Sequence, residues 1–288
     1  MKTAIIADST GDLSDEILSL PDIYQITLKT VFNDDTTFED SNKISKIKNF
    51  YKKLKNSSTL PKTSQPEPAQ TVQILKSLIK KKYQNVIFIL LSSGLSGTIQ
   101  TCKTIAKNYK NKINSFFVDS KGVSVVIENL VNQALRLLKE KKDLNLITKK
   151  LQWAANQSDI YILLGNLKNL VKGGRLSRSE GFLGNLLRIK PVLDINNSGK
   201  VIVLEKVRTS KRAFKHLLGY ISEKYRKFKG KAIVYFAHAD DEETAINLKK
   251  EFLKNHPNAQ IIVRYLTPVL GTYGGNGTIG TVVIPTVH

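Results

Sequence analysis

Hydroxyl and glycine residues crowd the stretch FILLSSGLSGTIQT at residues 88–101, where an apolar, strand-like run gives way to a helix-like segment. Between the two lie Ser92, Ser93, Gly94 and Ser96. Ligands of open parallel sheets collect outside the carboxyl ends of the strands. The free N–H groups at a helix start favour an anion, and glycine lets backbone approach it closely. The stretch predicts a site for a carboxylate or phosphate oxygen, or else an ordinary helix cap and turn.

A second hydroxyl-rich stretch, PKTSQPEP at residues 61–68, shows a similar pattern. It places Thr63, Ser64 and Gln65 just before a helix-like segment, and its prolines restrict how the chain enters that helix. A polar ligand contact and a plain cap with a turn are both compatible with this pattern.

Nucleophilic catalysis by Ser93 is the enzymatic alternative, in which a serine hydrolase would act on acyl esters. Such a serine needs a base, usually histidine, and an orienting acid. Of the four histidines only His238, in the strand end FAHADD, is well placed, and GLSG is not the G-x-S-x-G elbow. The histidines are isolated in the sequence, so no metal site is predicted.

The stretch GNGTIG at residues 275–280 matches the G-x-G-x-x-G pattern of dinucleotide-binding proteins. Only eight residues follow it, too few for the helix and the ribose-binding acid that such a site requires. We therefore expect no nucleotide cofactor, and we expect the glycine-rich segment that starts at Tyr273 to form a loop beside a site.

Composition narrows the choice of partners. The net charge is +21, but the lysines are scattered and no basic stripe is interleaved with aromatic residues, so no specific nucleic-acid site is expected. Binding of polyanions through the charge itself remains an alternative. The single cysteine excludes a disulfide framework. No apolar run is long enough for a membrane span or a signal peptide, so we expect a soluble, cytoplasmic protein.

Short apolar runs alternate with amphipathic segments, which predicts βαβ units and a parallel sheet in the first half of the chain. The second half favours an α/β domain with a mixed sheet. We expect two domains, residues 1–155 and residues 156–288. The expected strands cover residues 3–9, 25–33, 85–91, 113–120, 159–165, 200–208, 231–239, 259–273 and 278–286. The expected helices cover residues 44–55, 69–82, 98–109, 123–142, 212–228 and 241–256, with two short helices around a Gly-Gly turn within 167–193.

Several motifs occur together in a specific order: ADST, KTSQPEP, LSSGLSGTIQ, FVDSKG, LKNLVKGGRLS, GFLGNLLRIKPVL and EKVRTSKRA. In this series the chain resembles the DegV family of bacterial fatty-acid-binding proteins. The resemblance implies an N-terminal three-layer α/β/α domain with a parallel sheet, which carries the carboxylate-binding loops. It also implies a smaller C-terminal α/β domain that covers an apolar acyl tunnel. Some family members act as the FakB subunit, which presents a fatty acid such as palmitate to a separate kinase.

The resemblance also assigns residues. The threonine of T-S-Q-P is Thr63, and the serine after the strand maps to Ser93, with Ser92, Gly94 and Ser96 beside it. Both would bind the carboxylate of a long-chain fatty acid. Many relatives carry histidine in a G-T-H-x-G-like segment, but this chain has Tyr273, which can donate a hydrogen bond and cannot become a cation.

Two further expectations concern the surroundings of this site. Arg175 and Arg208 are expected near the pocket mouth, where they could meet a kinase or a phosphate; surface ion pairs are the alternative. Phe182, Leu183, Leu186 and Leu187 form an apolar face, either ordinary core or one wall of the tunnel. The resulting prediction is a lipid-binding protein without a catalytic residue or cofactor. The resemblance implies the role of a non-catalytic subunit of a fatty acid kinase.

Overall fold

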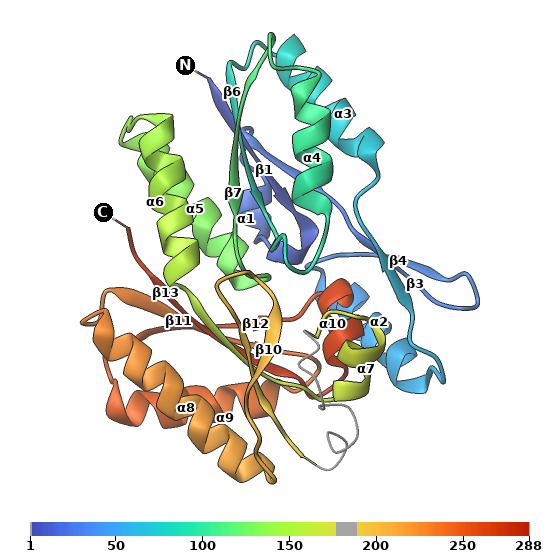
Figure 1. Cartoon of the computed structure of the whole chain (residues 1–288), viewed down its shortest axis with the longest axis vertical. Coiled ribbons are helices and arrows are strands. Elements are labelled where there is room, and N and C mark those ends of the chain that lie inside the picture. The colour runs from blue at the N-terminus through green and yellow to red at the C-terminus, as the bar shows by residue number, and fades with distance from the viewer. Residues whose placement is uncertain (1, 177–188, 288) are drawn as a thin grey trace.

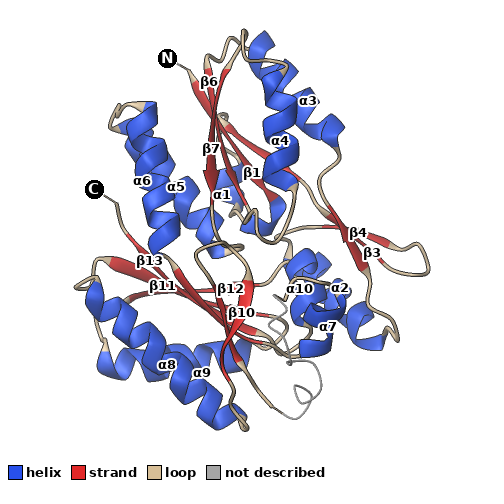
Figure 2. Ribbon diagram, in the orientation of Figure 1, coloured by secondary structure: helices blue, strands red, loops and turns tan. Residues whose placement is uncertain are grey.

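A computed structural model describes residues 2–176 and 189–287 (Figures 1 and 2). In the N-terminal part, four parallel strands pair in the order β2-β1-β6-β7. These strands are β1 (Thr3–Asp8), β2 (Ile23–Ile26), β6 (Asn85–Leu90) and β7 (Asn114–Asp119). The apolar runs of β1 and β6, the two central strands, are buried on both faces, as the sequence pattern predicts.

Helices cover both faces of this parallel sheet, because alternate side chains of each strand point in opposite directions. Ile6 and Phe88 pack with residues of α3 (Pro68–Lys80) and α4 (Thr98–Lys107). Ile5 and Ile87 share a core with α5 (Val125–Lys139) and α6 (Leu144–Gln157). The predicted three-layer α/β/α arrangement is confirmed.

The C-terminal part contains a mixed sheet of six strands in the order β10-β9-β8-β13-β11-β12, in which only β11 and β12 pair in parallel. Helices α8 (Ser210–Lys227) and α9 (Glu242–Asn255) cover one face of it. The strands are β8 (Asp159–Leu163), β9 (Val192–Ile195), β10 (Val201–Glu205), β11 (Ala232–His238), β12 (Gln260–Tyr265) and β13 (Ile279–Pro285). The predicted mixed sheet is confirmed.

The other face of the mixed sheet packs on α5 and α6, which lie between the two sheets in Figure 1. Tyr235 and Ile284 of the mixed sheet belong to the same continuous core as Ile5 and Ile87 of the parallel sheet. One helical layer therefore packs against both sheets. The division of the chain into two domains after residue 155 stays a prediction.

Several local predictions were incomplete. The expected strand at 25–33 is divided into β2 and β3 (Lys29–Val31). Strand β3 pairs with β4 (Thr37–Glu39) and β5 (Lys62–Ser64) in a small antiparallel sheet. Helix α6 and strand β9 were not predicted. Helix α2 (Ile44–Asn56) matches the helix expected at 44–55, and the remaining short helices are a 3-10 turn (Ser9–Gly11), α1 (Asp15–Leu18) and α7 (Leu167–Lys172).

The expected strand at 259–273 is wrong in its second half. Strand β12 ends at Tyr265, and Pro268–Gly274 forms helix α10. Proline is favoured in the first turn of a helix, where its fixed φ suits the backbone and its missing N–H is not needed. Tyr273 therefore lies in a helix and not in a glycine loop.

Helix α10 is anchored from several directions. Asp40 accepts hydrogen bonds from the Thr267 hydroxyl (3.1 Å), the Val269 N–H (2.9 Å) and the Ser9 hydroxyl (3.0 Å). The Tyr51 hydroxyl of α2 donates to the Leu266 carbonyl (2.9 Å). Because these partners are buried, the position of Tyr273 is fixed by elements from both ends of the chain.

Candidate functional site

A cavity of about 280 Å³ lies where the carboxyl end of the parallel sheet meets the mixed sheet. Its size is close to the lower limit of typical small-molecule pockets, about 300 Å³. Most of the described residues in its wall are apolar: Leu28, Leu91, Leu95, Val123, Val125, Ile160, Ile162, Leu164, Leu170, Ile195, Val201, Ala237, Leu266, Val269, Leu270 and Val282. The cavity therefore suits a long apolar ligand.

A polar cluster, which we define as Thr63, Ser96, Arg175 and Tyr273, also lines this cavity. Thr63 of β5 and Tyr273 of α10 hydrogen-bond through their hydroxyl groups. The Arg175 guanidinium carbon lies 4.9 Å from the centre of the Tyr273 ring. Thr63, Arg175 and Tyr273, which are far apart in the sequence, thus meet at one part of the wall, with a positive charge beside two hydroxyl groups.

The backbone around Arg175 holds its side chain in place. Its Nη1 donates to the Gly173 carbonyl (2.6 Å) and its Nε to the Leu95 carbonyl (3.4 Å). A Cβ at Gly173 would lie 2.5 Å from the Tyr273 ring, so glycine permits the close approach of the two segments. The expectation that Arg175 lies near the pocket fits this geometry.

Ser96 lies just before α4, as the sequence pattern anticipates. Its hydroxyl oxygen accepts from the Thr98 N–H (3.3 Å) and lies 2.9 Å from the Thr98 hydroxyl. Gln65 also lines the cavity, and its Nε2 lies 2.8 Å from the position of a Cβ at Gly97. The two hydroxyl-rich stretches of the sequence are therefore neighbours at the positive end of a helix dipole.

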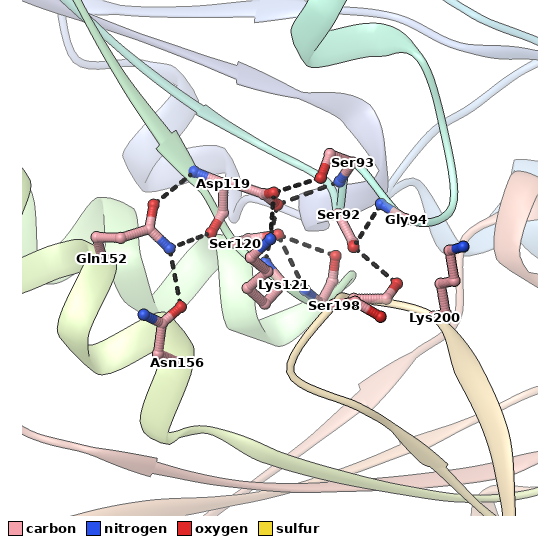
Figure 3. A network of polar contacts seen from close by, with 12 residues as sticks. Ser92, Ser93, Gly94, Asp119, Ser120, Lys121, Gln152, Asn156, Ser198 and Lys200 are labelled. Carbon is pink, nitrogen blue, oxygen red and sulfur yellow. Dashed lines mark hydrogen bonds and ion pairs between the residues drawn. The ribbon is translucent and has the colours of Figure 1, made fainter.

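Ser93, the leading sequence candidate, has a different environment (Figure 3). Its side chain is exposed and donates to Asp119 Oδ2 (2.5 Å), while Lys121 Nζ lies 2.9 Å from the same oxygen. Burial raises the pKa of Asp119, but the hydrogen bonds from Ser93 and Lys121 outweigh it and lower that pKa below its ordinary value. Ser93 does not line the cavity, whereas Ser96 of the same loop does.

Ser92 and Gly94 are likewise not among the residues that line the cavity. The Ser92 hydroxyl donates to the Gly199 carbonyl (2.8 Å) and accepts from the Gly94 N–H (3.1 Å). A Cβ at Gly94 would lie 2.5 Å from the Gly199 carbonyl oxygen. The contacts of these two residues hold the loop after β6 against the turn between β9 and β10. Their role in this structure is to stabilise that packing.

Comparison with known proteins decides the family. A family model described as an uncharacterised protein of the DegV family matches residues 2–286. The chain belongs to the DegV family. A DegV domain-containing protein of Streptococcus pyogenes serotype M1 is 33% identical over 285 residues, covering 99% of both chains.

Solved structures of DegV proteins share the fold over the whole length. A fatty acid binding DegV family protein from Streptococcus agalactiae is 31% identical and superposes with a TM-score of 0.92, covering 100% of both chains. DegV of Bacillus subtilis, described as a fatty acid binding protein, is 29% identical with a TM-score of 0.88 and 99% coverage of both chains. Neither the family match nor these relatives name a catalytic activity.

The hydrolase alternative finds no support in the geometry of this DegV chain. His238 is buried, and its Nδ1 accepts a hydrogen bond from the Asp241 N–H (3.3 Å). Burial lowers the pKa of this histidine. Within the described ranges, no hydrogen bond joins His238 to Ser93, so the nucleophile and base of a serine hydrolase are not assembled.

The other sequence expectations have mixed outcomes. Arg208 is exposed and does not line the cavity. The apolar face at 182–187 lies outside the described residues. In the part of the chain that the structure covers, no cluster of His, Cys, Asp or Glu side chains could hold a metal ion. None of the helices described here has the length and apolarity needed to cross a bilayer.

Proposed function

We propose that this DegV protein binds one long-chain fatty acid, with its acyl chain in the apolar cavity and its carboxylate at the polar cluster. The observation that carries this proposal is that one cavity combines two features. Its apolar wall comes from the mixed sheet and from segments that follow the parallel strands, and two hydroxyl groups and an arginine lie together in that wall. Fatty acid binding by relatives of similar sequence and fold supports it.

The two parts of the ligand would contribute differently. Burial of a long acyl chain yields roughly 10 kcal/mol before costs, at about 0.8 kcal/mol per CH₂ group. A hydrogen bond to a charged head group adds about 1.5–3 kcal/mol. The tail therefore sets most of the affinity, while Thr63, Ser96 and Tyr273 fix the position of the carboxylate. Arg175 supplies the opposite charge.

Presentation of the bound acid to a separate fatty acid kinase is the finer part of the proposal. The resemblance to FakB subunits supports it, and a cytoplasmic location beside such a kinase is part of the same proposal. The exposed position of Arg208 leaves its guanidinium accessible to a partner protein. Replacement of Arg208 by alanine should spare fatty acid binding and slow acyl-phosphate formation when a cognate kinase is supplied.

Native mass spectrometry of the purified protein, followed by titration of delipidated protein with palmitate, tests the proposal. We expect the mass of one fatty acid on the purified protein and one saturable site in the titration. Hydrolysis of acyl esters without retention of the acid would instead support an enzyme. Binding of oligonucleotides with a steep salt dependence, in the absence of lipid binding, would support the polyanion alternative.

A further inference from the structure

Ser124 is a second polar group in the cavity wall, separate from the polar cluster. It immediately precedes α5, is 3% exposed and lines the cavity between Val123 and Val125. Its hydroxyl oxygen is buried and has no hydrogen-bond partner among the described residues. A buried hydroxyl without a partner destabilises a protein, so this one requires an explanation.

The usual explanation for serine at this position does not apply. Serine before a helix normally accepts a hydrogen bond from the first turn, but the Ser124 side chain makes no such bond. Its backbone has φ 55° and ψ −131°, a conformation that residues other than glycine rarely adopt. The residue therefore has an unfavourable backbone and an unpaired hydroxyl at the same place.

A catalytic explanation also fails for Ser124. A serine nucleophile requires a base within hydrogen-bond distance of its hydroxyl. No histidine or carboxylate in the described part of the chain hydrogen-bonds with Ser124. The hydroxyl is therefore available to bind a ligand and is not activated to attack one.

We infer that Ser124 recognises an oxygen substituent along the acyl chain, so that the preferred ligands include hydroxy fatty acids. This inference rests on the proposed binding of a fatty acid in the cavity. A ligand hydroxyl can both donate to and accept from the serine, and the positive end of the α5 dipole favours an oxygen acceptor. An unsubstituted chain would leave the serine unpaired among apolar groups.

The test compares stearate with a panel of monohydroxystearates that differ only in the position of the hydroxyl group. Each acid is titrated into the delipidated parent protein and into Ser124→Ala and Ser124→Gly. Alanine keeps the constrained backbone, whereas glycine tolerates the positive φ, so the two variants separate the hydroxyl from backbone strain. The measured quantity is the ratio of the dissociation constants of stearate and of each hydroxystearate.

We expect at least one positional isomer to bind the parent about fivefold to tenfold more tightly than stearate, the effect of one added hydrogen bond. Both variants should reduce that ratio to about one. If stearate binds but no isomer is preferred, or if the preference persists in both variants, the role of Ser124 is refuted. If stearate itself does not bind the parent, the proposed function fails and this inference fails with it.

Discussion

Thr63 and Ser96 reach the cavity from different local structures, a strand and the start of a helix. The sequence marks both as hydroxyl groups near helix N-termini. It cannot distinguish Ser93 from Ser96, because both follow the same strand in one short loop. The choice depends on Asp119 at the end of the neighbouring strand, which binds the Ser93 hydroxyl. The unpaired hydroxyl of Ser124 likewise has no signal in the sequence.

Removal of either hydroxyl at the cavity should weaken fatty acid binding. Thr63→Val and Ser96→Ala should each cost about 1–3 kcal/mol of binding free energy, because each removes a possible donor to a charged acceptor. Isothermal titration with palmitate measures the effect. Ser93→Ala is the matched control and should retain the affinity of the parent. A larger loss of affinity for Ser93→Ala than for Ser96→Ala would show that the carboxylate binds Ser93 and not Ser96.

Tyr273 provides a second residue-scale prediction. Tyr273→Phe removes the hydroxyl that meets Thr63 and should weaken palmitate binding by about 1 kcal/mol. Histidine titrates near pH 6.5, so Tyr273→His should bind more tightly as the pH falls from about 8 to 6. The parent should show a nearly flat profile over that range. Identical profiles for the parent and both variants would place the carboxylate away from Tyr273.

At the scale of elements, prediction from sequence succeeded where the pattern is long and periodic. The buried strands and amphipathic helices of the parallel sheet are of this kind. It merged β3 with β2 and missed β4 and β5, because a strand of three residues shows no measurable alternation. It failed also for α10, because the segment from 259 to 273 is mainly apolar and only Pro268 marks the change from strand to helix.

Asp40 should make the stability of the α10 region depend on pH. Burial raises the pKa of Asp40 to about 7, against the hydrogen bonds from Val269, Thr267 and Ser9, which lower it. The folded protein therefore holds a proton that the unfolded chain loses above pH 3.8. The stability from this proton is complete at low pH and is lost as the pH rises to about 7.

The variant Asp40→Asn retains an uncharged side chain at every pH. Between about pH 4 and 7 the parent should lose stability relative to this variant, by at most about 1.4 kcal/mol per pH unit. Urea denaturation of both proteins across this range measures the difference. A difference that does not change with pH would show that Asp40 is ionised in the folded protein throughout.

At the scale of the whole molecule, α5 and α6 join the two sheets into one core. Tyr235 of the mixed sheet accepts a hydrogen bond from Asn129 of α5 (3.1 Å), and Gln133 donates to the Pro285 carbonyl (3.2 Å). The sequence predicted two domains but could not show that one helical layer is shared, because a buried apolar face does not specify its partner.

This shared layer predicts cooperative unfolding and a global effect of the ligand. Thermal unfolding should occur in one transition by circular dichroism and by calorimetry. A fatty acid at a concentration of 100 times its dissociation constant should stabilise the protein by about 2.7 kcal/mol, since it binds only the folded state. Two separated transitions, of which the fatty acid shifts only one, would show that the sheets unfold independently.

The central claim is that the acyl chain of the fatty acid occupies this cavity. The most direct test is to fill the cavity with an added side chain. Gly280 of β13 lines it, and a Cβ there would have only the Ala237 Cβ within 4 Å, at 3.9 Å. Gly280→Leu should therefore place an apolar side chain in the acyl path without disrupting the fold. Gly219→Leu on the exposed side of α8 is the matched control, since a Cβ there meets no atom within 4 Å.

The measurement is the dissociation constant of palmitate for delipidated parent, Gly280→Leu and Gly219→Leu, with circular dichroism as the check of folding. We predict that Gly280→Leu loses at least tenfold in affinity, about 1.4 kcal/mol, while Gly219→Leu binds like the parent. A folded Gly280→Leu protein that binds palmitate as tightly as the parent would contradict the assignment of this cavity to the acyl chain.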